Sequence, residues 1–452
     1  MKPLQAGLVG IGTVGSGTFA VLRRNQQEIR RRASRAIEIS TVADLDTARA
    51  QALVGGAAQV VADARSILDD PRIDVVIELV GGYGFAKSLV MDAIAAGKHV
   101  VTANKALLAL HGTEIFAAAR ERGVMVAFEA AVAGGIPIIK ALREGLTANR
   151  IEWVAGIING TTNFILSEMR AKGLDFVTAL KEAQRLGYAE ADPTFDIEGV
   201  DAAHKITLMS AIAFGVPVQF AKAHVEGITG LQAADIGYAE QLGYRIKLLG
   251  IARRTAAGIE LRVHPTLVPK ERLIANVEGA MNAVMVHGDA VGTTLYYGKG
   301  AGAEPTASAV IADLVDIARL HSAEPGHRVP HLAFQHDAMS EMPILPIEEV
   351  VTAFYLRLQV ADQAGVLARI TGILAGLDIS IDALLQRPHD SAGSTAVSAD
   401  PESETRQERP QSDVIILTHD TVEGRMTQAI AEMQRLPTVL APIVRIRKEG
   451  LA

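Results

Sequence analysis

The chain has 452 residues, more than one hydrophobic core usually supports, so we expect about two to four domains. Its residues are 49% hydrophobic and 21% charged, as in ordinary globular proteins, and the absence of cysteine excludes disulfides, thiolate nucleophiles and cysteine-ligated metals. The formal net charge of −7 argues against nucleic acid as a partner.

The first 130 residues alternate short apolar runs with longer amphipathic stretches. The runs are too continuous for half-exposed strands and suit strands buried on both faces of a parallel sheet. They are Leu4–Val9, Ile37–Ala43, Val75–Val80, His99–Ala103 and Val124–Phe128. Helices such as Gly84–Ala96 and Leu107–Arg122 lie between them. Repeated βαβ units of this kind predict an α/β domain over residues 1–130, a Rossmann doubly wound parallel sheet.

No signal-peptide pattern precedes the first strand, and no apolar run reaches the roughly 18–20 residues of a membrane helix. We therefore expect a cytoplasmic protein without a membrane partner.

The hydrophobic pattern is different over residues 131–321, where strand-like runs mix with long helical stretches. This mixture predicts a central α+β domain. The runs are Trp153–Ile158, Ile259–His264 and Ala283–His287. The helical stretch Ala307–Leu320 is expected to pack back on the first domain. Residues 322–349 are rich in proline and lack periodicity, which predicts a linker.

Residues 350–452 show a compact βαββαβ pattern, the ferredoxin-like order. The predicted elements are Phe354–Val360, Val366–Ala375, Ile379–Leu385, Val414–Thr418, Gly424–Arg435 and Val439–Ile446. Between the second and third strands, residues 388–412 are polar and poor in apolar side chains, so we expect a mobile loop there.

A glycine motif, Gly10-Ile11-Gly12-Thr13-Val14-Gly15, follows the first strand and opens a helix. Such glycines permit a tight turn, a close backbone approach to a pyrophosphate and close packing of helix on strand, which predicts a dinucleotide site. Asp44 ends the second strand, where a carboxylate would bind the ribose of NAD and repel the 2′-phosphate of NADP. Arg49 and the arginines between residues 23 and 35 favour NADP instead, so the preference for NAD is slight.

A second cluster of polar residues begins at Gly187 and ends at Lys205. Asp201 and Lys205 are four residues apart and would share one helix face, a spacing that usually produces only a surface ion pair. Glu190 and Asp196 lie in the preceding loop, so several carboxylates and one lysine can converge. Such a set suits a substrate with an ammonium group and a hydroxyl group.

The segment from Gly187 to Lys205 resembles the signature of homoserine dehydrogenases. Three further stretches agree with that family in the expected order: Glu78-Leu79-Val80-Gly81-Gly82, residues 97–105 (GKHVVTANK) and Asn159-Gly160-Thr161-Thr162-Asn163. The resemblance covers roughly residues 4–320. It implies NAD(P)-dependent interconversion of L-homoserine and L-aspartate 4-semialdehyde, in threonine, methionine and isoleucine biosynthesis. It also implies a homodimer or homotetramer, with residues 131–321 as the catalytic and oligomerisation domain.

The same resemblance implies roles for individual residues. Lys205 would transfer the proton of the substrate hydroxyl, with Lys105 at the nicotinamide end of the cofactor. The substrate would be held by Glu190 and Asp201, with Asp196 and Thr161 as further contacts, and the cofactor approached by Gly187 and Gly302. A free lysine, with a pKa of about 10.4, is a poor base at neutral pH, but a second cation or desolvation would lower that pKa.

Residues 129–137 resemble the segment that binds a monovalent cation, Na⁺ or K⁺, in this family. The implied ligands are the backbone carbonyls of Val132, Gly134 and Ile136, with a contribution from Glu129. Oxygen-only ligation suits a hard cation. The alternative is a glycine-rich junction between two domains.

The C-terminal domain resembles an ACT domain, the small amino-acid-sensing module, through its Asp362-Gln363-Ala364-Gly365-Val366-Leu367 turn. L-Threonine is the expected effector, and the alternative is a role in assembly only. Two other functions remain open for the whole chain. One is a different amino-acid dehydrogenase on the same scaffold, and the other is a catalytically inert sensor of cofactor and amino acid.

Overall fold

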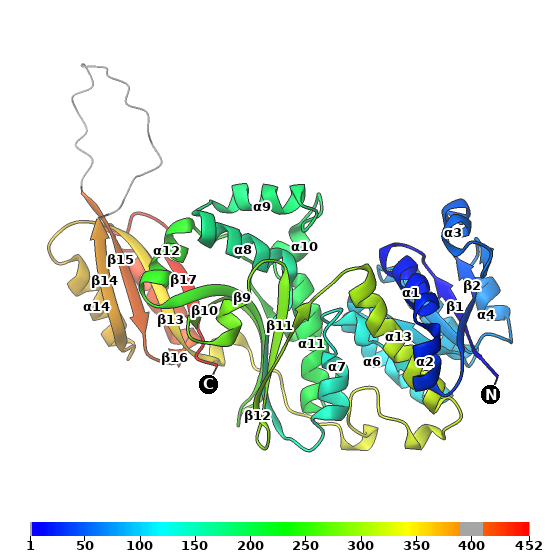
Figure 1. The fold of residues 1–452 in the computed structure, drawn as a ribbon. Coiled ribbons are helices and arrows are strands. Elements are labelled where there is room, and N and C mark those ends of the chain that lie inside the picture. Colours follow the sequence, from blue (N-terminus) through cyan, green and yellow to red (C-terminus); the bar gives the residue numbers. More distant parts are fainter. Residues whose placement is uncertain (1, 389–409, 452) are drawn as a thin grey trace, which may run out of the picture. The chain divides into compact units, whose positions relative to one another are not determined.

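The computed structural model describes residues 2–388 and 410–451 (Figure 1). The chain forms two compact units. The first contains the residues up to Gly230 together with Leu248–His264 and Asn276–Ile344, and the second contains Leu231–Lys247, Pro265–Ala275 and the residues from Leu345 onward. Most of the polar segment 388–412 lies outside the described residues. Among the described residues, no helix combines the length and apolar character needed to cross a membrane.

The N-terminal part of the first unit is a six-stranded parallel sheet with the order β3-β2-β1-β4-β5-β6. Its strands are β1 (Leu4–Val9), β2 (Ile37–Ala43), β3 (Gln59–Val61), β4 (Val75–Glu78), β5 (His99–Thr102) and β6 (Val126–Ala127). This order confirms the predicted Rossmann sheet, and its topological switch point lies between β1 and β4, where such folds bind dinucleotides.

Helices α1 to α6 connect these strands: α1 (Thr13–Arg24), α2 (Gln26–Ala33), α3 (Thr47–Val54), α4 (Arg65–Asp69), α5 (Gly84–Ala95) and α6 (Lys105–Arg122). Helix α13 (Ala303–Leu320) joins them from far along the chain, because its buried residues belong to the same apolar core as β1, β2 and β4. Gly17 of α1 makes this approach possible, since a Cβ atom there would lie 2.6 Å from the Ala303 carbonyl oxygen. An ion pair of 2.7 Å between Arg24 and Glu304 adds a polar contact.

The rest of the first unit is built on a mostly antiparallel sheet of order β12-β11-β7-β9-β10, with the short β8 paired to β10. The first residues of β9 and the last residues of β10 belong to the second unit. The strands are β7 (Ile151–Ile157), β8 (His224–Val225), β9 (Tyr244–Arg254), β10 (Ile259–Pro269), β11 (Met281–Gly288) and β12 (Gly292–Lys299). The helices are α7 (Ile138–Lys140), α8 (Gly160–Lys172), α9 (Phe176–Arg185), α10 (Thr194–Ile197) and α11 (Val200–Phe214). Every residue of α11 after Val200 is buried, which makes this helix the core of the catalytic part.

The second unit has the sheet order β17-β13-β15-β14, and its element order confirms the predicted ferredoxin-like fold. Its elements are α12 (Ala233–Gln241), β13 (Val351–Ala361), α14 (Val366–Gly376), β14 (Ile381–Pro388), β15 (Gln411–Thr418), β16 (Thr421–Val422), α15 (Glu423–Gln434) and β17 (Val444–Lys448). The last strand was predicted to begin at Val439, but it begins five residues later, at Val444. Val439 instead forms an isolated bridge with Val360.

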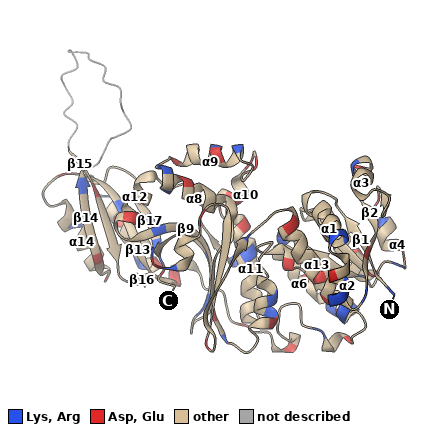
Figure 2. Ribbon diagram, viewed as in Figure 1, with Lys and Arg blue, Asp and Glu red and all other residues tan. Residues whose placement is uncertain are grey.

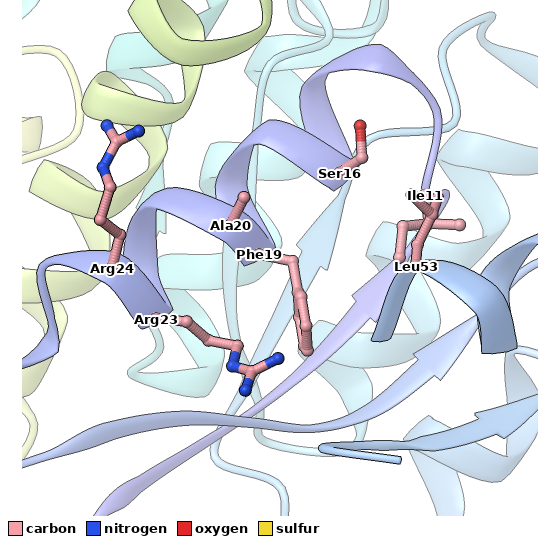
Figure 3. Close-up of a pocket in the computed structure, with 7 residues that line it drawn as sticks. All are labelled: Ile11, Ser16, Phe19, Ala20, Arg23, Arg24 and Leu53. Atoms are coloured by element: carbon pink, nitrogen blue, oxygen red, sulfur yellow. The ribbon is translucent and has the colours of Figure 1, made fainter. Parts of the chain in front are cut away.

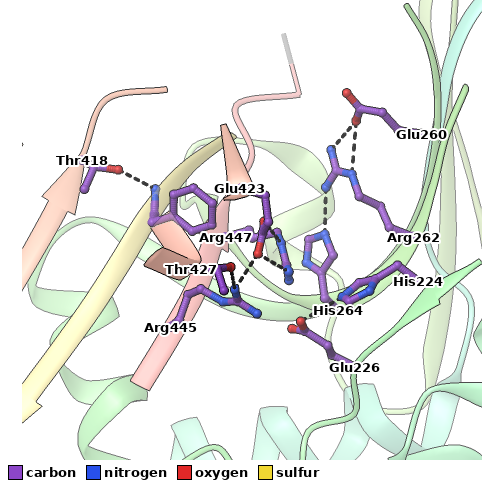
Figure 4. A network of polar contacts seen from close by, with 11 residues as sticks. His224, Glu226, Glu260, Arg262, His264, Thr418, Glu423, Thr427, Arg445 and Arg447 are labelled. Atoms are coloured by element: carbon purple, nitrogen blue, oxygen red, sulfur yellow. Dashed lines mark hydrogen bonds and ion pairs between the residues drawn. The ribbon is translucent and has the colours of Figure 1, made fainter. Parts of the chain in front are cut away.

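Each unit contains buried ion pairs of its own, and Figure 4 shows one example from each. In the second unit, the Glu423 carboxylate at the start of α15 accepts hydrogen bonds from Arg447 Nε and Nη2, both at 2.7 Å. In the first unit, Arg262 donates to Glu260 Oε2 from Nε at 3.1 Å and from Nη2 at 2.8 Å. Arg447 meets both oxygens of its carboxylate, whereas Arg262 directs two donors to one oxygen, and in each pair these hydrogen bonds offset the cost of burying the charges.

Candidate active site

The centre of the site is the pair Asp201 and Lys205 on α11. The helix begins at Gly199, whose positive φ of 82° forms the N-terminal cap, and this places both residues one turn apart on one face. Lys205 Nζ donates to Asp201 Oδ2 at 2.6 Å and to the Ile158 carbonyl oxygen at 2.7 Å. The predicted shared helix face is therefore present, but the pair is buried and not on the surface.

Lys105 reaches the same carboxylate from the Rossmann part. Its position is fixed by Asn104, which caps α6 by accepting a hydrogen bond from Leu107 N at 3.0 Å. Lys105 Nζ lies 3.2 Å from Asp201 Oδ1. Asp201 therefore presents one oxygen to each of two lysines, from helices that are about one hundred residues apart in the chain.

The charges in this group influence one another. Burial lowers the pKa of Lys205, the Asp201 carboxylate opposes that change, and the Lys105 ammonium adds to it. Burial alone would raise the pKa of Asp201, but the two lysines hold it below its ordinary value. At neutral pH the carboxylate is therefore ionised, and Lys205 gives up its proton more easily than a free lysine.

A second carboxylate, Asp196, is joined to the first by Asn159. The Asn159 amide donates to Asp196 Oδ1 at 2.7 Å and to Asp201 Oδ2 at 2.9 Å. Thr161 Oγ1 lies 3.0 Å from Asp196 Oδ2 and 2.7 Å from the Tyr188 carbonyl oxygen. Burial, together with the nearby Asp201 charge, raises the pKa of Asp196.

Asn159 was not among the predicted site residues, although its motif was recognised. It caps α8 through its side-chain oxygen, which accepts from Thr162 N at 2.8 Å, while its amide group faces the carboxylates. The sequence carries only the capping signal, an asparagine directly before a helix. The hydrogen bonds from the amide to Asp196 and Asp201 depend on residues that are distant in sequence.

Glu190 and Gly187 lie apart from this group. Glu190 is exposed, and within the described residues its carboxylate forms no hydrogen bond or ion pair. Its carbonyl oxygen accepts from Gln184 Nε2 at 3.1 Å. Gly187 is exposed too and adopts a positive φ of 76° directly after α9. The structure thus unites Lys205, Asp201, Lys105, Asp196 and Thr161, and leaves Glu190 and Gly187 on the loop beside them.

The glycine loop has the shape that a dinucleotide needs. A Cβ atom on Gly10 would lie 2.8 Å from the Leu79 carbonyl oxygen, and one on Gly15 would lie 2.1 Å from that of Gly10. At Gly12 a Cβ atom would meet nothing within 4 Å, so the loop is open there. The N-terminus of α1 has no side-chain cap, which leaves the amides around Thr13 and Val14 available for phosphate oxygens.

Asp44 directly follows β2, and its side chain accepts hydrogen bonds from the backbone of this loop and of its own turn. Its Oδ2 accepts from Ile11 N at 2.8 Å and its Oδ1 from Asp46 N at 2.9 Å. Gly302, with a φ of 132°, caps α13, and this helix also begins without a side-chain cap. Because α13 touches α1 through Gly17, both helix starts lie on the same part of the unit.

A cavity of about 400 Å³ lies along α1 next to the glycine loop (Figure 3). Arg23 lines it and places its guanidinium 5.7 Å from the centre of the Phe19 ring. Arg24 is engaged by Glu304, and Arg31 and Arg32 pair with Glu28 on the basic helix α2 (Figure 2). Three of the six arginines between residues 23 and 35 are therefore paired locally, two of them with the same carboxylate, as expected for a solvated helix end.

The predicted cation segment contains a strained turn. Ala133 and Gly134 both have positive φ values, 56° and 43°, and a Cβ atom on Gly134 would lie 2.5 Å from the Gly300 carbonyl oxygen. Within the described residues, the carbonyl oxygens of Val132 and Gly134, both in buried residues, accept no hydrogen bond. Such orphaned oxygens fit a hard cation. The carbonyl of Ile136 already accepts from Ile138 N at 2.8 Å.

The Glu129 side chain has a second set of partners near the predicted cation segment. Its two carboxylate oxygens accept from Ile139 N at 2.9 Å and Lys140 N at 2.8 Å at the start of α7, which leaves each oxygen a further lone pair. Burial raises its pKa to about 7. No group of three or more His, Asp or Glu side chains that could hold a metal occurs in the part of the chain that the structure describes.

Comparisons with known proteins identify the family of the chain. The family models "Homoserine dehydrogenase, NAD binding domain", "Homoserine dehydrogenase" and "ACT domain" match residues 10–129, 137–315 and 354–437. Homoserine dehydrogenases of Pseudomonas aeruginosa and Neisseria gonorrhoeae are 57% and 56% identical, and the alignments cover 100% of both chains in each case. A crystal structure of a homoserine dehydrogenase from Thiobacillus denitrificans is 62% identical, with a TM-score of 0.92 over 100% of this chain and 99% of the other.

Proposed function

Since the chain belongs to the homoserine dehydrogenase family, we propose that Lys205, Asp201 and Lys105 are the residues that carry out its reaction. The protein is an NAD(P)-dependent oxidoreductase that interconverts L-homoserine and L-aspartate 4-semialdehyde. The observation that supports these roles best is the Asp201 carboxylate shared by two lysines, at 2.6 Å and 3.2 Å. The other amino-acid dehydrogenase and the inert sensor are not favoured by the full-length relatives.

Lys205 has the hydrogen-bonding capacity to act on the substrate hydroxyl. An ammonium group has three donors, and Asp201 and Ile158 take two of them. The third is left for the hydroxyl oxygen of homoserine. In oxidation, neutral Lys205 accepts the hydroxyl proton, and in reduction the ammonium returns it to the developing alkoxide. The nicotinamide cofactor, when bound, supplies the hydride chemistry.

Asp201 and Lys105 prepare this proton transfer. The carboxylate keeps Lys205 oriented and offsets its loss of hydration, while the second ammonium makes the proton easier to release. Lys105, which is one-third exposed, would also face the substrate and the nicotinamide end of the cofactor.

Asp196 is the best partner for the ammonium group of the substrate. Its hydrogen bonds come only from neutral groups, Asn159 and Thr161, so its charge is free to pair with a cation. Glu190, on the exposed loop next to it, would close on the substrate from the solvent side. Thr161 would orient Asp196.

The cofactor would bind over the Gly10–Gly15 loop, with its pyrophosphate on the amides of α1 and with Gly302 and Gly187 approaching it. The negative charge of Asp44 at the end of β2 favours the ribose of NAD over the phosphate of NADP. The pairing of Arg24, Arg31 and Arg32 with glutamates supports the same preference.

A monovalent cation, Na⁺ or K⁺, would occupy the turn at Ala133 and Gly134. The carbonyl oxygens of Val132 and Gly134 would be its main ligands, with Ile136 and the backbone of Glu129 as further candidates. Its role would be structural, since it would fix the junction between the Rossmann part and the catalytic part.

The second unit would regulate or assemble the enzyme. Gly365, with a φ of 87°, caps α14 without a side-chain hydrogen bond, so the turn offers free amides to the carboxylate of an amino acid such as L-threonine. We further propose a cytoplasmic homodimer or homotetramer that serves threonine, methionine and isoleucine biosynthesis. The proposed domain limits remain 1–130, 131–321 and 350–452, with a linker at 322–349.

The test measures the reduction of NAD and of NADP in the presence of L-homoserine, by absorbance. It compares the parent chain with Lys205→Ala and Lys205→Arg. We expect turnover in the parent and a loss of at least about 100-fold in both variants, with unchanged melting temperature for Lys205→Arg. The ratio of kcat/KM values ranks the two cofactors. Full activity of Lys205→Ala would rule out its role in proton transfer, and a preference for NADP would contradict the interpretation of Asp44.

A further inference from the structure

Three aromatic rings form a cluster beside the reactive end of α11. The ring of His204 lies between Phe195 of α10, at 5.3 Å between ring centres, and Phe220, at 4.3 Å. We refer to Phe195, His204 and Phe220 as the aromatic cluster. None of these three residues has a place in the reaction described above.

The aromatic cluster reaches the reacting group through Lys105. The Lys105 ammonium lies 5.9 Å from the centre of the Phe195 ring, within the distance at which the face of a ring attracts a cation. Its ion-pair partner is Asp201 Oδ1 at 3.2 Å. Lys105 thus lies between a carboxylate oxygen and an aromatic face, although its side chain is 33% exposed.

His204 packs against Phe195, although its own burial costs free energy. It is 4% exposed, and its Nδ1 atom is buried without a hydrogen-bond partner. An aliphatic side chain would fill this space without an unsatisfied nitrogen, so apolar packing alone does not account for the histidine. Burial lowers the pKa of His204 to about 4, the Asp201 charge opposes this, and both lysines add to it. His204 is therefore neutral at pH 7 and adds no third cation next to the lysine pair.

Phe195 itself depends on this support. It lies in the four-residue helix α10, and its ring is 42% exposed, so few neighbours restrict it. The rings of Phe195 and His204 are tilted by 55° relative to each other, an arrangement of the kind that aromatic pairs prefer. The order of contacts is then Phe220, His204, Phe195 and finally Lys105.

We propose that Phe195, supported by His204, is a positioning residue that holds the Lys105 ammonium against Asp201 for the reaction. This inference rests on the proposed role of Lys105. Phe195 touches the lysine and acts through it, so its loss should lower kcat/KM only where Lys105 is present.

The test compares Phe195→Leu with Phe195→Tyr, which keeps an aromatic face, and repeats Phe195→Leu in a Lys105→Met background. Phe334→Leu is the matched control, because that ring is 39% exposed in the same unit and packs near Gly215. We expect a loss of kcat/KM of about 3- to 30-fold for Phe195→Leu. Phe195→Tyr and Phe334→Leu should stay within about twofold of the parent. Melting temperatures check that each variant is folded.

The double-mutant cycle separates the possible outcomes. If Phe195→Leu has no further effect in the Lys105→Met background, the ring acts through Lys105 as proposed. An equal loss in both backgrounds, or a loss below twofold in the parent, overturns the inference while the role of Lys105 stands. Parent-like activity of Lys105→Met alone overturns the role of Lys105 and this inference with it.

Discussion

Two buried carboxylates, Asp235 of the second unit and Asp201 of the first, are satisfied by different partners. In the second unit, Asp235 accepts from Arg357 Nε at 2.6 Å and Nη2 at 3.1 Å, and from Tyr355 at 3.1 Å. In the first unit, Asp201 is divided between two lysines, and Lys205 retains an unused donor. A carboxylate saturated by a planar guanidinium is fixed, whereas one shared by ammonium groups can exchange partners. We infer from this comparison that the buried Arg357–Asp235 pair serves the structure, and we propose that the lysines on Asp201 serve the reaction.

The largest effect should come from breaking a saturated pair. Arg357→Met leaves Asp235, which is fully buried, without its counter-charge and should lower the free energy of unfolding by about 3–5 kcal/mol. Chemical denaturation measures this change, and kcat of the protein that remains folded should be unchanged. Arg425→Met is the control, because its pair with Asp378 is exposed and contributes about 1 kcal/mol at most. Equal stabilities of the two variants would contradict the comparison.

Removal of the Asp201 charge should have the opposite result and lower kcat more than stability. Asp201→Asn keeps the size of the side chain but removes the charge that orients both lysines, so kcat should fall by about 100- to 1,000-fold. Stopped-flow or steady-state assays with homoserine measure the loss. A kcat within tenfold of the parent would show that Asp201 acts as a structural pair like Asp235.

Asp196 tests whether a carboxylate with only neutral donors binds a substrate cation. In Asp196→Asn the KM for homoserine should rise by about tenfold, because one charge-assisted contact is lost, while KM for the cofactor stays the same. Since burial raises the pKa of Asp196, the parent should show the same weakening as the pH falls and this group becomes protonated. The variant should lack that pH dependence, and a pH profile of KM identical to that of the parent would argue against the assignment.

The smallest effect concerns His331, a partly buried group with no ionic partner. His331 Nε2 accepts from Val126 N at 3.1 Å, and burial lowers the pKa of His331 to about 4. A base whose folded pKa lies below its unfolded value of about 6.5 contributes stability above that value and loses it as the pH falls. Between pH 7 and pH 5 the parent should lose about 1–2 kcal/mol more than His331→Gln. His336→Gln, at an exposed site, should follow the parent.

Much of the fold was predictable because its signals are local. Continuous apolar runs identified the parallel strands, and the glycines at residues 10, 12 and 15 identified the cofactor loop. Predicted strand boundaries were wrong where a turn interrupts an apolar run. Ile379 was predicted to begin a strand, but Asp378 adopts a positive φ of 58° and Ile379 N bonds to Leu374 O at 2.9 Å. The strand therefore begins at Ile381.

The site was only partly predictable. The four-residue spacing of Asp201 and Lys205 predicted a shared helix face, since helix geometry fixes that relation. Lys105 and Asn159 reach the same carboxylate only through the tertiary fold, so no spacing could predict those contacts. The resemblance to a family supplied Lys105, but it did not supply Asn159 or Phe195.

The position of α13 also has a consequence for synthesis on the ribosome. The strands of the Rossmann sheet are complete at Ala127, but the helix that covers their shared core begins only at Ala303. At about 5–20 residues per second, that apolar surface stays uncovered for on the order of ten seconds or longer. During this interval the nascent chain presents an exposed apolar surface of the kind that chaperones recognise.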